Sequence, residues 1–102
     1  MNIIKKTSAK EFANGTSLVG YITTTYDKLV EAFGEPNYGP SGDDKVQSEW
    51  VLDINGDPCT IYDWKVTETP KERYKWHVGG KSSKVLVPLA EAFNWEVSRF
   101  TI

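Results

Sequence analysis

The stretch KWHVGGKSSK at residues 75–84 gathers residue types that can bind an anion. Backbone N–H groups at the start of a helix, preceded by two glycines, form a natural anion site, to which a lysine adds charge and a serine adds a hydroxyl group. A nucleotide-binding P-loop also ends in this way, but it requires a glycine at the position of Lys75, so that motif is excluded. The stretch therefore predicts either a phosphate site or an ordinary strand-to-helix turn with a serine N-cap. The residues concerned are Gly79, Gly80, Lys81, Ser82 and Ser83.

His77 is a candidate general base, because the pKa of a histidine lies near neutrality. No nucleophile pairs clearly with it, and one histidine, one cysteine and scattered acids lack the spacing of metal ligands. We therefore predict that the protein is not an enzyme and holds no metal and no cofactor. On the polar face of a strand, His77 is expected to be solvated.

Asp63 is expected to point toward the core. The Asn55-Gly56 pair predicts a two-residue hairpin turn, and the register of that turn places Asp63 on the same inward face as Cys59. A buried carboxylate must be hydrogen-bonded or paired with a cation. Asp63 is therefore either a structural anchor or a residue that contacts a ligand.

Tyr62 and Trp64 then lie on the opposite face of the predicted sheet. An aromatic sheet face that nothing covers usually binds a partner, a second copy of the chain or a stacked base. The alternative is that the N-terminal segment or the loop at 35–47 covers these rings. The complete set of candidate ligand-binding residues is Tyr62, Asp63, Trp64, Lys65, Trp76, His77, Gly79, Gly80, Lys81, Ser82 and Ser83.

The net charge of −2 conceals an asymmetry along the chain. Residues 31–63 hold eight acids and one base, a net charge of −7, whereas residues 65–84 hold six bases and two acids, a net charge of +4. One segment can therefore meet a basic partner and the other an anionic one, unless neighbouring strands pair acid against base and the fields cancel. The candidate protein-binding residues in the acidic segment are Tyr38, Asp43, Asp44, Glu49 and Asp53.

The 102 residues predict one domain, spanning 1–102, and the 39 % of hydrophobic residues are enough for one core. A single cysteine forms no intramolecular disulfide, so a reducing cytoplasm is the expected compartment. The chain has neither an apolar secretory signal at its start nor a run of about 18 apolar residues, so no membrane association is expected. A pI of about 5.3 argues against direct nucleic-acid binding.

Two helices are predicted. Tyr26, Leu29, Val30 and Phe33 recur at helical spacing after Thr24 or Thr25, and Gly34 ends the pattern, which gives a helix over 25–33. A second helix follows the KWHVGGKSSK stretch. Pro88 requires that its first turn is irregular or that the regular helix starts near the proline.

The strand predictions come from alternating apolar residues and from turn signals. The Asn-Gly turn pairs Leu52 with Cys59 and Trp50 with Ile61. We expect a long mobile loop at 35–47 and strands at 2–7, 48–54, 59–66, 74–78 and 95–102. Residues 18–23 are expected to form a short strand or an extended lead-in. The fold class is α+β: a two-layer sandwich with a mainly antiparallel sheet of four to five strands and two helices on one face.

Four segments carry a family likeness: GYITTTYDKLVEAFGEP, DKVQSEWVL, TIYDWK and WHVGGKSS. Across about residues 15–84 the chain resembles a group of small uncharacterised proteins that tailed bacteriophages encode. The resemblance brings no settled activity, but it implies an accessory phage protein in the bacterial cytoplasm. It also marks positions to test within the Ile-Tyr-Asp-Trp-Lys and Trp-His-x-Gly-Gly motifs. These are Tyr62, Asp63, Trp64, Lys65, Trp76, His77, Gly79 and Gly80.

The leading functional hypothesis is a non-enzymatic inhibitor of a host defence system or host enzyme, an anti-defence protein comparable to anti-CRISPR proteins. The alternative is a sponge that captures a nucleotide immune signal at the Gly-Gly-Lys-Ser-Ser corner. A host protein is the expected partner, a nucleotide or phosphate ligand is the second candidate, and an exposed sheet face would favour a homodimer.

Overall fold

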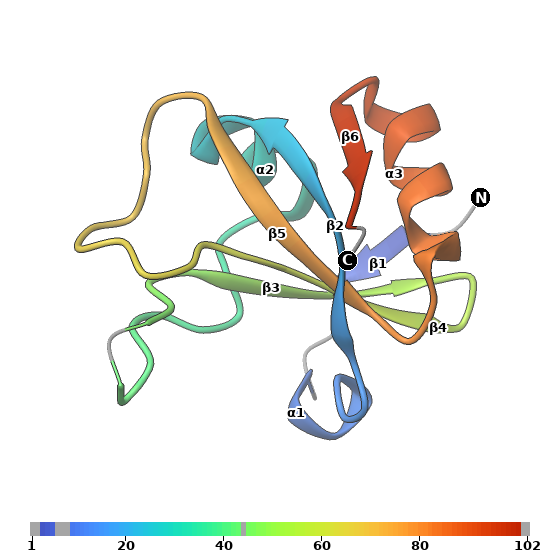
Figure 1. The fold of residues 1–102 in the computed structure, drawn as a ribbon, viewed down its shortest axis with the longest axis horizontal. Helices are drawn as coiled ribbons and strands as arrows, with labels where there is room; N and C mark the ends of the chain where they lie inside the picture. The colour runs from blue at the N-terminus through green and yellow to red at the C-terminus, as the bar shows by residue number, and fades with distance from the viewer. Residues whose placement is uncertain (1–2, 6–8, 44, 101–102) are drawn as a thin grey trace.

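A computed structural model describes residues 3–5, 9–43 and 45–100, which form a six-stranded antiparallel sheet with helices (Figure 1). The strand order is β1-β3-β4-β5-β2-β6. The elements are β1 (Ile3–Lys5), α1 (Ala9–Phe12), β2 (Ser17–Thr24), α2 (Tyr26–Phe33), β3 (Glu49–Ile54), β4 (Asp57–Tyr62), β5 (Tyr74–Gly80), the 3-10 turn η1 (Ser83–Val85), α3 (Leu86–Phe93) and β6 (Glu96–Arg99).

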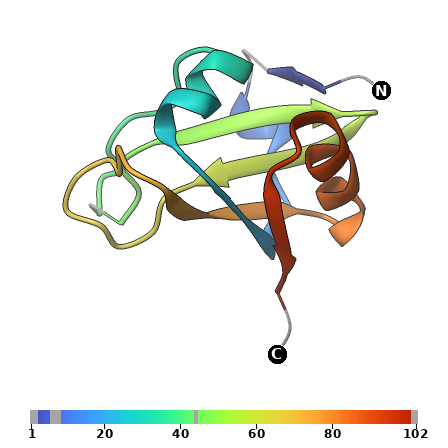
Figure 2. The ribbon, with the colours of Figure 1, turned by 90° about the horizontal axis from the view of Figure 1, so that it is seen from above.

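The predicted α+β class is confirmed, and the sheet has six strands where four to five were expected. Figure 2 shows β3, β4 and β5 side by side in the middle of the sheet, with β1 beyond β3. One hydrophobic cluster joins the sheet to both longer helices: Leu29 of α2 and Leu89 of α3 pack with Trp50, Ile61 and Trp76 of the strands. The opposite face of the sheet carries neither α2 nor α3.

The β3–β4 hairpin forms in the predicted register. Trp50 pairs with Ile61 and Leu52 with Cys59, and all four side chains are buried. Asn55 and Gly56 have φ values of 55° and 93°, which is the left-handed backbone that a tight hairpin turn requires. The Asp53 carboxylate accepts a hydrogen bond from the Gly56 N–H at 2.7 Å and so fixes the turn.

Helix α2 begins and ends where the sequence predicts. The Thr25 hydroxyl accepts a hydrogen bond from the Lys28 N–H at 3.2 Å, and Gly34 follows the last turn with a φ of 81°. Leu29 is buried, and Tyr26, Val30 and Phe33 pack against the core beside it. These contacts hold α2 over the sheet.

The strand predicted to end at residue 78 continues to Gly80, which corrects the expected break at the two glycines. Gly79 pairs with Thr60 of β4 and Leu18 of β2, so it sits in the interior of the sheet. A Cβ on Gly79 would collide with the Thr60 hydroxyl oxygen, so the missing side chain serves close packing rather than a turn.

The chain after β5 combines the two arrangements expected around Pro88: an irregular first turn, η1, and a regular helix that starts two residues before the proline. The Ser82 hydroxyl accepts a hydrogen bond from the Lys84 N–H at 3.2 Å and caps η1, and Pro88 is the third residue of α3. Proline is tolerated there because the first N–H groups of a helix have no partner within the helix.

The outer strands differ most from the predictions. The segment predicted as a short strand at 18–23 forms the eight-residue β2, which pairs with β5 on one side and β6 on the other. The last strand, predicted over 95–102, spans four residues. Parts of the predicted first and last strands, at 2, 6–7 and 101–102, lie outside the described residues.

Candidate functional site

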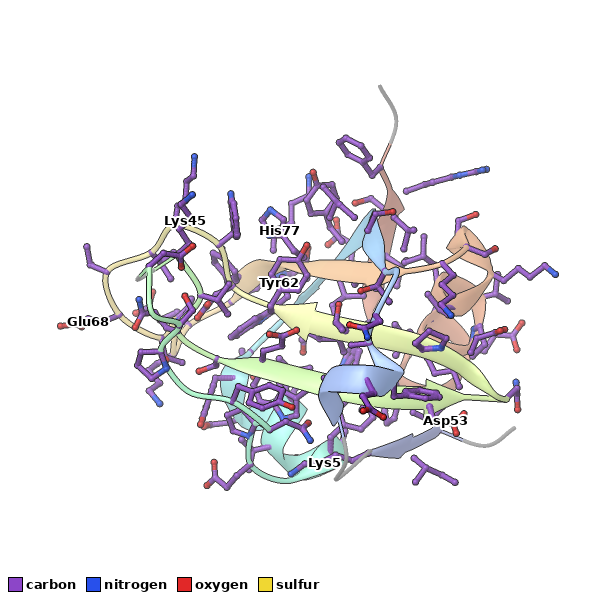
Figure 3. The ribbon with its side chains drawn as sticks, turned by 90° about the horizontal axis from the view of Figure 1, so that it is seen from below. Lys5, Lys45, Asp53, Tyr62, Glu68 and His77 are labelled. Atoms are coloured by element: carbon purple, nitrogen blue, oxygen red, sulfur yellow. The ribbon has the colours of Figure 1, made fainter. Side chains whose placement is uncertain are left out.

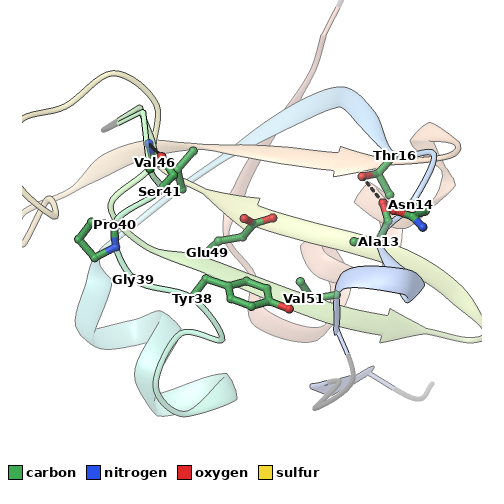
Figure 4. A pocket seen from close by; sticks show the side chains of 11 residues that line it. Ala13, Asn14, Thr16, Tyr38, Gly39, Pro40, Ser41, Val46, Glu49 and Val51 are labelled. Carbon is green, nitrogen blue, oxygen red and sulfur yellow. Dashed lines mark hydrogen bonds between the residues drawn. The ribbon is translucent and has the colours of Figure 1, made fainter.

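A groove crosses the face of the sheet opposite α2 and α3, which we call the helix-free face although the one-turn α1 borders it (Figure 4). Its main part has a volume of about 650 Å³ and lies between the turn after α1, at residues 13–16, and the loop at residues 38–46, with Glu49 and Val51 of β3 in its lining. A second hollow of about 220 Å³ shares Thr16, Val46 and Glu49 with it. That hollow reaches Thr60, Tyr62, Trp64 and Gly79. We call the two hollows together the groove.

Hydrogen bonds hold both walls of the groove. The Thr16 hydroxyl donates to the Ala13 carbonyl at 2.8 Å. In the opposite wall, the Ser41 N–H donates to the Val46 carbonyl at 2.7 Å, while backbone bonds of 3.1 Å join Tyr38 to Glu49 in both directions. The 35–47 loop, predicted to be mobile, is therefore fastened to β3 and closed upon itself.

Glu49 is the charged residue where the two hollows meet. Burial raises the pKa of its carboxyl group. The described residues supply neither a hydrogen bond nor an ion pair to this carboxylate. Its charge instead raises the pKa of Tyr62 across the strand pair, as a lesser cause after burial. The groove thus contains a negative charge that no described cation neutralises.

An aromatic cluster lies beside the groove, on the same face of the sheet. His77 lies 5.1 Å from the ring of Tyr21, 5.5 Å from Tyr62 and 6.4 Å from Trp64, measured between ring centroids. Phe100 joins the cluster at 6.4 Å from Tyr21. Figure 3 shows Tyr62 and His77 on this side of the sheet, with Lys45 nearby.

Three lysines surround the aromatic cluster. The ammonium groups of Lys45 and Lys65 lie 5.9 and 5.8 Å from the Trp64 ring centroid, and that of Lys75 lies 4.4 Å from the Tyr21 ring. Trp64 nevertheless leaves 38 % of its surface exposed. A large exposed ring among cations is suited to bind a partner rather than to fill a core.

His77 is half-buried within this cluster, whereas it was expected to be solvated. Burial lowers its pKa, and the charge of Lys75 adds to the effect, so the environment favours the neutral imidazole. Its Nδ1 is buried and has no hydrogen-bond partner in the described structure. The packing of rings from β2 and β4 around it explains the difference.

Asp63 faces inward, as predicted, and is fully buried. Its Oδ1 accepts hydrogen bonds from the Gln47 N–H at 2.6 Å and the Ser48 N–H at 3.2 Å. Burial raises the pKa of the carboxyl group, and these two N–H groups oppose that change. Asp63 therefore anchors the chain before β3 to the end of β4.

The predicted ligand-binding residues do not form one site. Tyr62, Trp64, Lys65, His77 and Gly79 border the helix-free face, whereas Trp76 and Asp63 are buried. His77 pairs with Tyr62, and Gly79 pairs with Thr60 and lines the second hollow with Tyr62 and Trp64. Gly80 pairs with Cys59, near the start of β4, so the rest of the Gly-Gly-Lys-Ser-Ser corner leads away from the Tyr62–Lys65 stretch. The later residues of the corner lie at the start of η1: Gly80, Lys81, Ser82 and Ser83. The predicted serine N-cap is observed there, at Ser82.

The predicted protein-binding residues separate in the same way. Tyr38 and Glu49 line the groove. Asp43 organises the loop, since its carboxylate accepts bonds from the Ser41 hydroxyl and the Lys45 N–H, and the first of these bonds is the main cause of its lowered pKa. Asp53 belongs to the hairpin turn, and Asp44 lies outside the described residues.

Charge cancellation between the acidic and basic segments was the alternative to two separate charged surfaces. The ion pair that Arg73 forms joins it to Glu96 of β6, not to the acidic segment. Lys45, Lys65 and Lys75 lie against aromatic rings, and Glu49 has no described cation beside it. Around the groove, the two kinds of charge therefore remain separate.

The sequence did not reveal four members of this surface: Tyr21, Lys45, Lys75 and Phe100. Tyr21 meets His77 because β2 pairs with β5, and these strands are separated by more than 45 residues without a turn that joins them. For Lys75 the sequence did hold a signal, because the alternation of residues 74–78 places it on the same face as His77.

Among the described residues, no group of three or more histidine, cysteine, aspartate or glutamate side chains is placed to hold a metal ion. None of their helices has the length and apolar character that crossing a bilayer requires. Comparison with protein-family models, curated proteins and solved structures gave no match to this chain.

Proposed function

We propose that the protein is a non-enzymatic binding protein that inhibits a host protein. In this proposal it is a phage-encoded accessory protein of the anti-defence kind, and it acts in the cytoplasm of the infected cell. The phage family that the sequence resembles supports the biological setting. The helix-free face of the sheet supplies the binding surface.

The observation that carries the proposal is the position of Trp64. Its ring is 38 % exposed at the end of the groove, and Tyr62 lies beside it at 6.3 Å between ring centroids. Tryptophan and tyrosine are over-represented among the residues that dominate the energy of protein interfaces. An exposed tryptophan beside an open groove is thus suited to be the centre of an interface.

The test is capture of a host protein by wild-type and variant protein, followed by an assay of the captured protein's own activity. We expect Trp64→Ala to abolish both capture and inhibition. Val87→Ala is the matched control, because Val87 is also an exposed apolar residue but lies on α3. Equal capture and inhibition by Trp64→Ala and wild type would overturn the proposal, as would the absence of any inhibited host protein.

A second candidate, nucleotide binding, is favoured by the three lysines around the aromatic cluster. Rings that stack on a base, together with cations for phosphates, are the usual combination for such ligands. Thermal shifts with linear and cyclic nucleotides test it, since a ligand at 100 times its Kd stabilises the protein by about 2.7 kcal/mol. Loss of the shift in Lys65→Gln assigns the ligand to the cluster, and loss in Lys81→Ala assigns it to the Gly-Gly-Lys-Ser-Ser corner. The absence of a shift with every nucleotide would exclude this candidate.

A further inference from the structure

We propose that the groove binds the cationic end of an arginine or lysine side chain, presented by an extended segment of the partner protein, with the Glu49 carboxylate as its counter-charge. This inference rests on the proposed function and names the chemistry of the partner. We infer a cationic side chain because its charge is complementary to that of the groove.

The position of Glu49 makes it the centre of the groove. Its side chain lines both hollows, so a chain that passes from one to the other crosses the carboxylate. Beside it lie Tyr38 and Tyr62, whose backbones pair with Glu49. A carboxylate flanked by two aromatic residues is a suitable environment for a guanidinium or ammonium group, which interacts with both.

Among the described residues that line the groove, Glu49 is the only charged one, so the charge of the lining favours a cation. Lys45 and Lys65 direct their ammonium groups to the Trp64 ring, at 5.9 and 5.8 Å, and neither pairs with Glu49. Burial disfavours the ionised form of Glu49, and a bound cation would offset that cost.

The form of the groove favours an extended segment. Its lining comes from successive strands, with Glu49 on β3, Thr60 on β4 and Gly79 on β5, between the walls formed by the turn and the loop. One side chain would meet Glu49 while its neighbours reach Trp64. The groove and the proposed interface around Trp64 are thus one continuous surface.

The experiment is an NMR titration of the ¹⁵N-labelled protein with N-acetyl-arginine amide and, separately, with its neutral isostere N-acetyl-citrulline amide. The variants are Glu49→Gln and the matched control Glu91→Gln, which makes the same change at an exposed site on α3. Because no described group bonds the Glu49 carboxylate, Glu49→Gln is expected to keep the fold. A partly buried charge-assisted contact is worth about 1.5–3 kcal/mol, so Glu49→Gln should weaken arginine binding at least about tenfold.

The expected result is that the arginine derivative shifts the amide signals of Thr16, Val46, Val51 and Thr60 in wild type and in Glu91→Gln. The citrulline derivative should leave them unchanged. Equal binding by Glu49→Gln, equal binding of citrulline, or shifts confined to other surfaces would overturn the inference.

The outcome is separable from that of the proposed function. If Glu49→Gln captures and inhibits the host protein as well as wild type does, while Trp64→Ala does not, the proposed function stands and this inference is wrong. If the arginine derivative binds at Glu49 but no host protein is inhibited, the cation site stands and the proposed function is wrong.

Discussion

The two faces of the sheet hold their tryptophans differently. On the helix-covered face Trp50 and Trp76 are fully buried, meet edge to face at 5.6 Å, and donate their indole N–H groups to the carbonyls of Gly34 and Thr24. On the helix-free face Trp64 leaves 38 % of its surface exposed, with lysines near its ring.

The contrast separates residues that maintain the fold from residues available for binding. Buried, hydrogen-bonded rings contribute to stability through packing, whereas an exposed ring contributes little to it and much to an interface. Substitutions on the two faces should therefore have opposite consequences for stability and for partner binding.

The largest expected effect is that of Trp76→Ala. Removing this buried ring leaves a cavity and takes the indole donor away from the Thr24 carbonyl, so the free energy of unfolding should fall by about 3–5 kcal/mol. Urea denaturation followed by circular dichroism measures it. The comparison variant Trp64→Ala should change the same quantity by less than about 1 kcal/mol. Similar losses for both variants would contradict the division between the faces.

Asp63→Ala comes next. The substitution leaves the Gln47 and Ser48 N–H groups without their acceptor, which should cost about 2–3 kcal/mol of unfolding free energy. Amide hydrogen exchange at residues 47 and 48 should accelerate, because the anchor between the loop and β4 is lost. Asp57→Ala, at an exposed acid at the start of β4, is the control. Unchanged exchange at the two amides would show that Asp63 does not anchor the loop.

Gly79→Ala tests how closely β5 approaches the side chains on the helix-free face. The added methyl group collides with the Thr60 hydroxyl, and such overpacking should cost about 1–3 kcal/mol. Because Thr60→Ala removes the colliding atom, the double variant should lose less stability than the sum of the single variants. A strictly additive result from urea denaturation would mean that another contact causes the loss.

Glu49→Gln should have the smallest effect and the opposite sign. Burial raises the pKa of Glu49 in the folded state, so folding favours the protonated form and the ionised form destabilises the protein at pH 7. The protonated carboxyl group of Glu49 makes its full contribution to the stability of wild type below the pKa of the unfolded state. This contribution is lost as the pH rises through the pKa of the folded state. We expect Glu49→Gln to raise the unfolding free energy by about 0.5 kcal/mol at pH 7 and to match wild type near pH 3. A gain that is independent of pH would show that charge is not its cause.

Local sequence signals predicted the parts of the fold that local chemistry determines. Thr25 and Gly34 delimit α2 because a hydroxyl cap and a left-handed glycine act within one turn. The Asn55-Gly56 turn fixed the β3–β4 register, and that register alone placed Asp63 inside and Tyr62 outside.

The remaining features depend on contacts between distant segments. Nothing near Tyr21 indicates that β2 pairs with β5, so the rings that bury His77 could not be foreseen. Gly79 and Gly80 were read as a turn because glycine permits turns. In the structure Gly79 is required by Thr60, a residue of another strand. The groove likewise needs the turn after α1 and the 38–46 loop to meet the same strand.

The short outer strands also bear on self-association. In the described structure β1 covers only Leu52–Ile54 of β3, and the rest of that edge is closed by the Asn37 side chain, which accepts from the Val51 N–H at 2.8 Å, and by the Tyr38 bridge. At the other edge β6 has four residues and carries Glu96 and Arg99. Unpaired strand edges are the usual templates for amyloid-like growth, and short, charged or occupied edges suppress it. Such edges protect the protein against aggregation through its sheet while the helix-free face stays open.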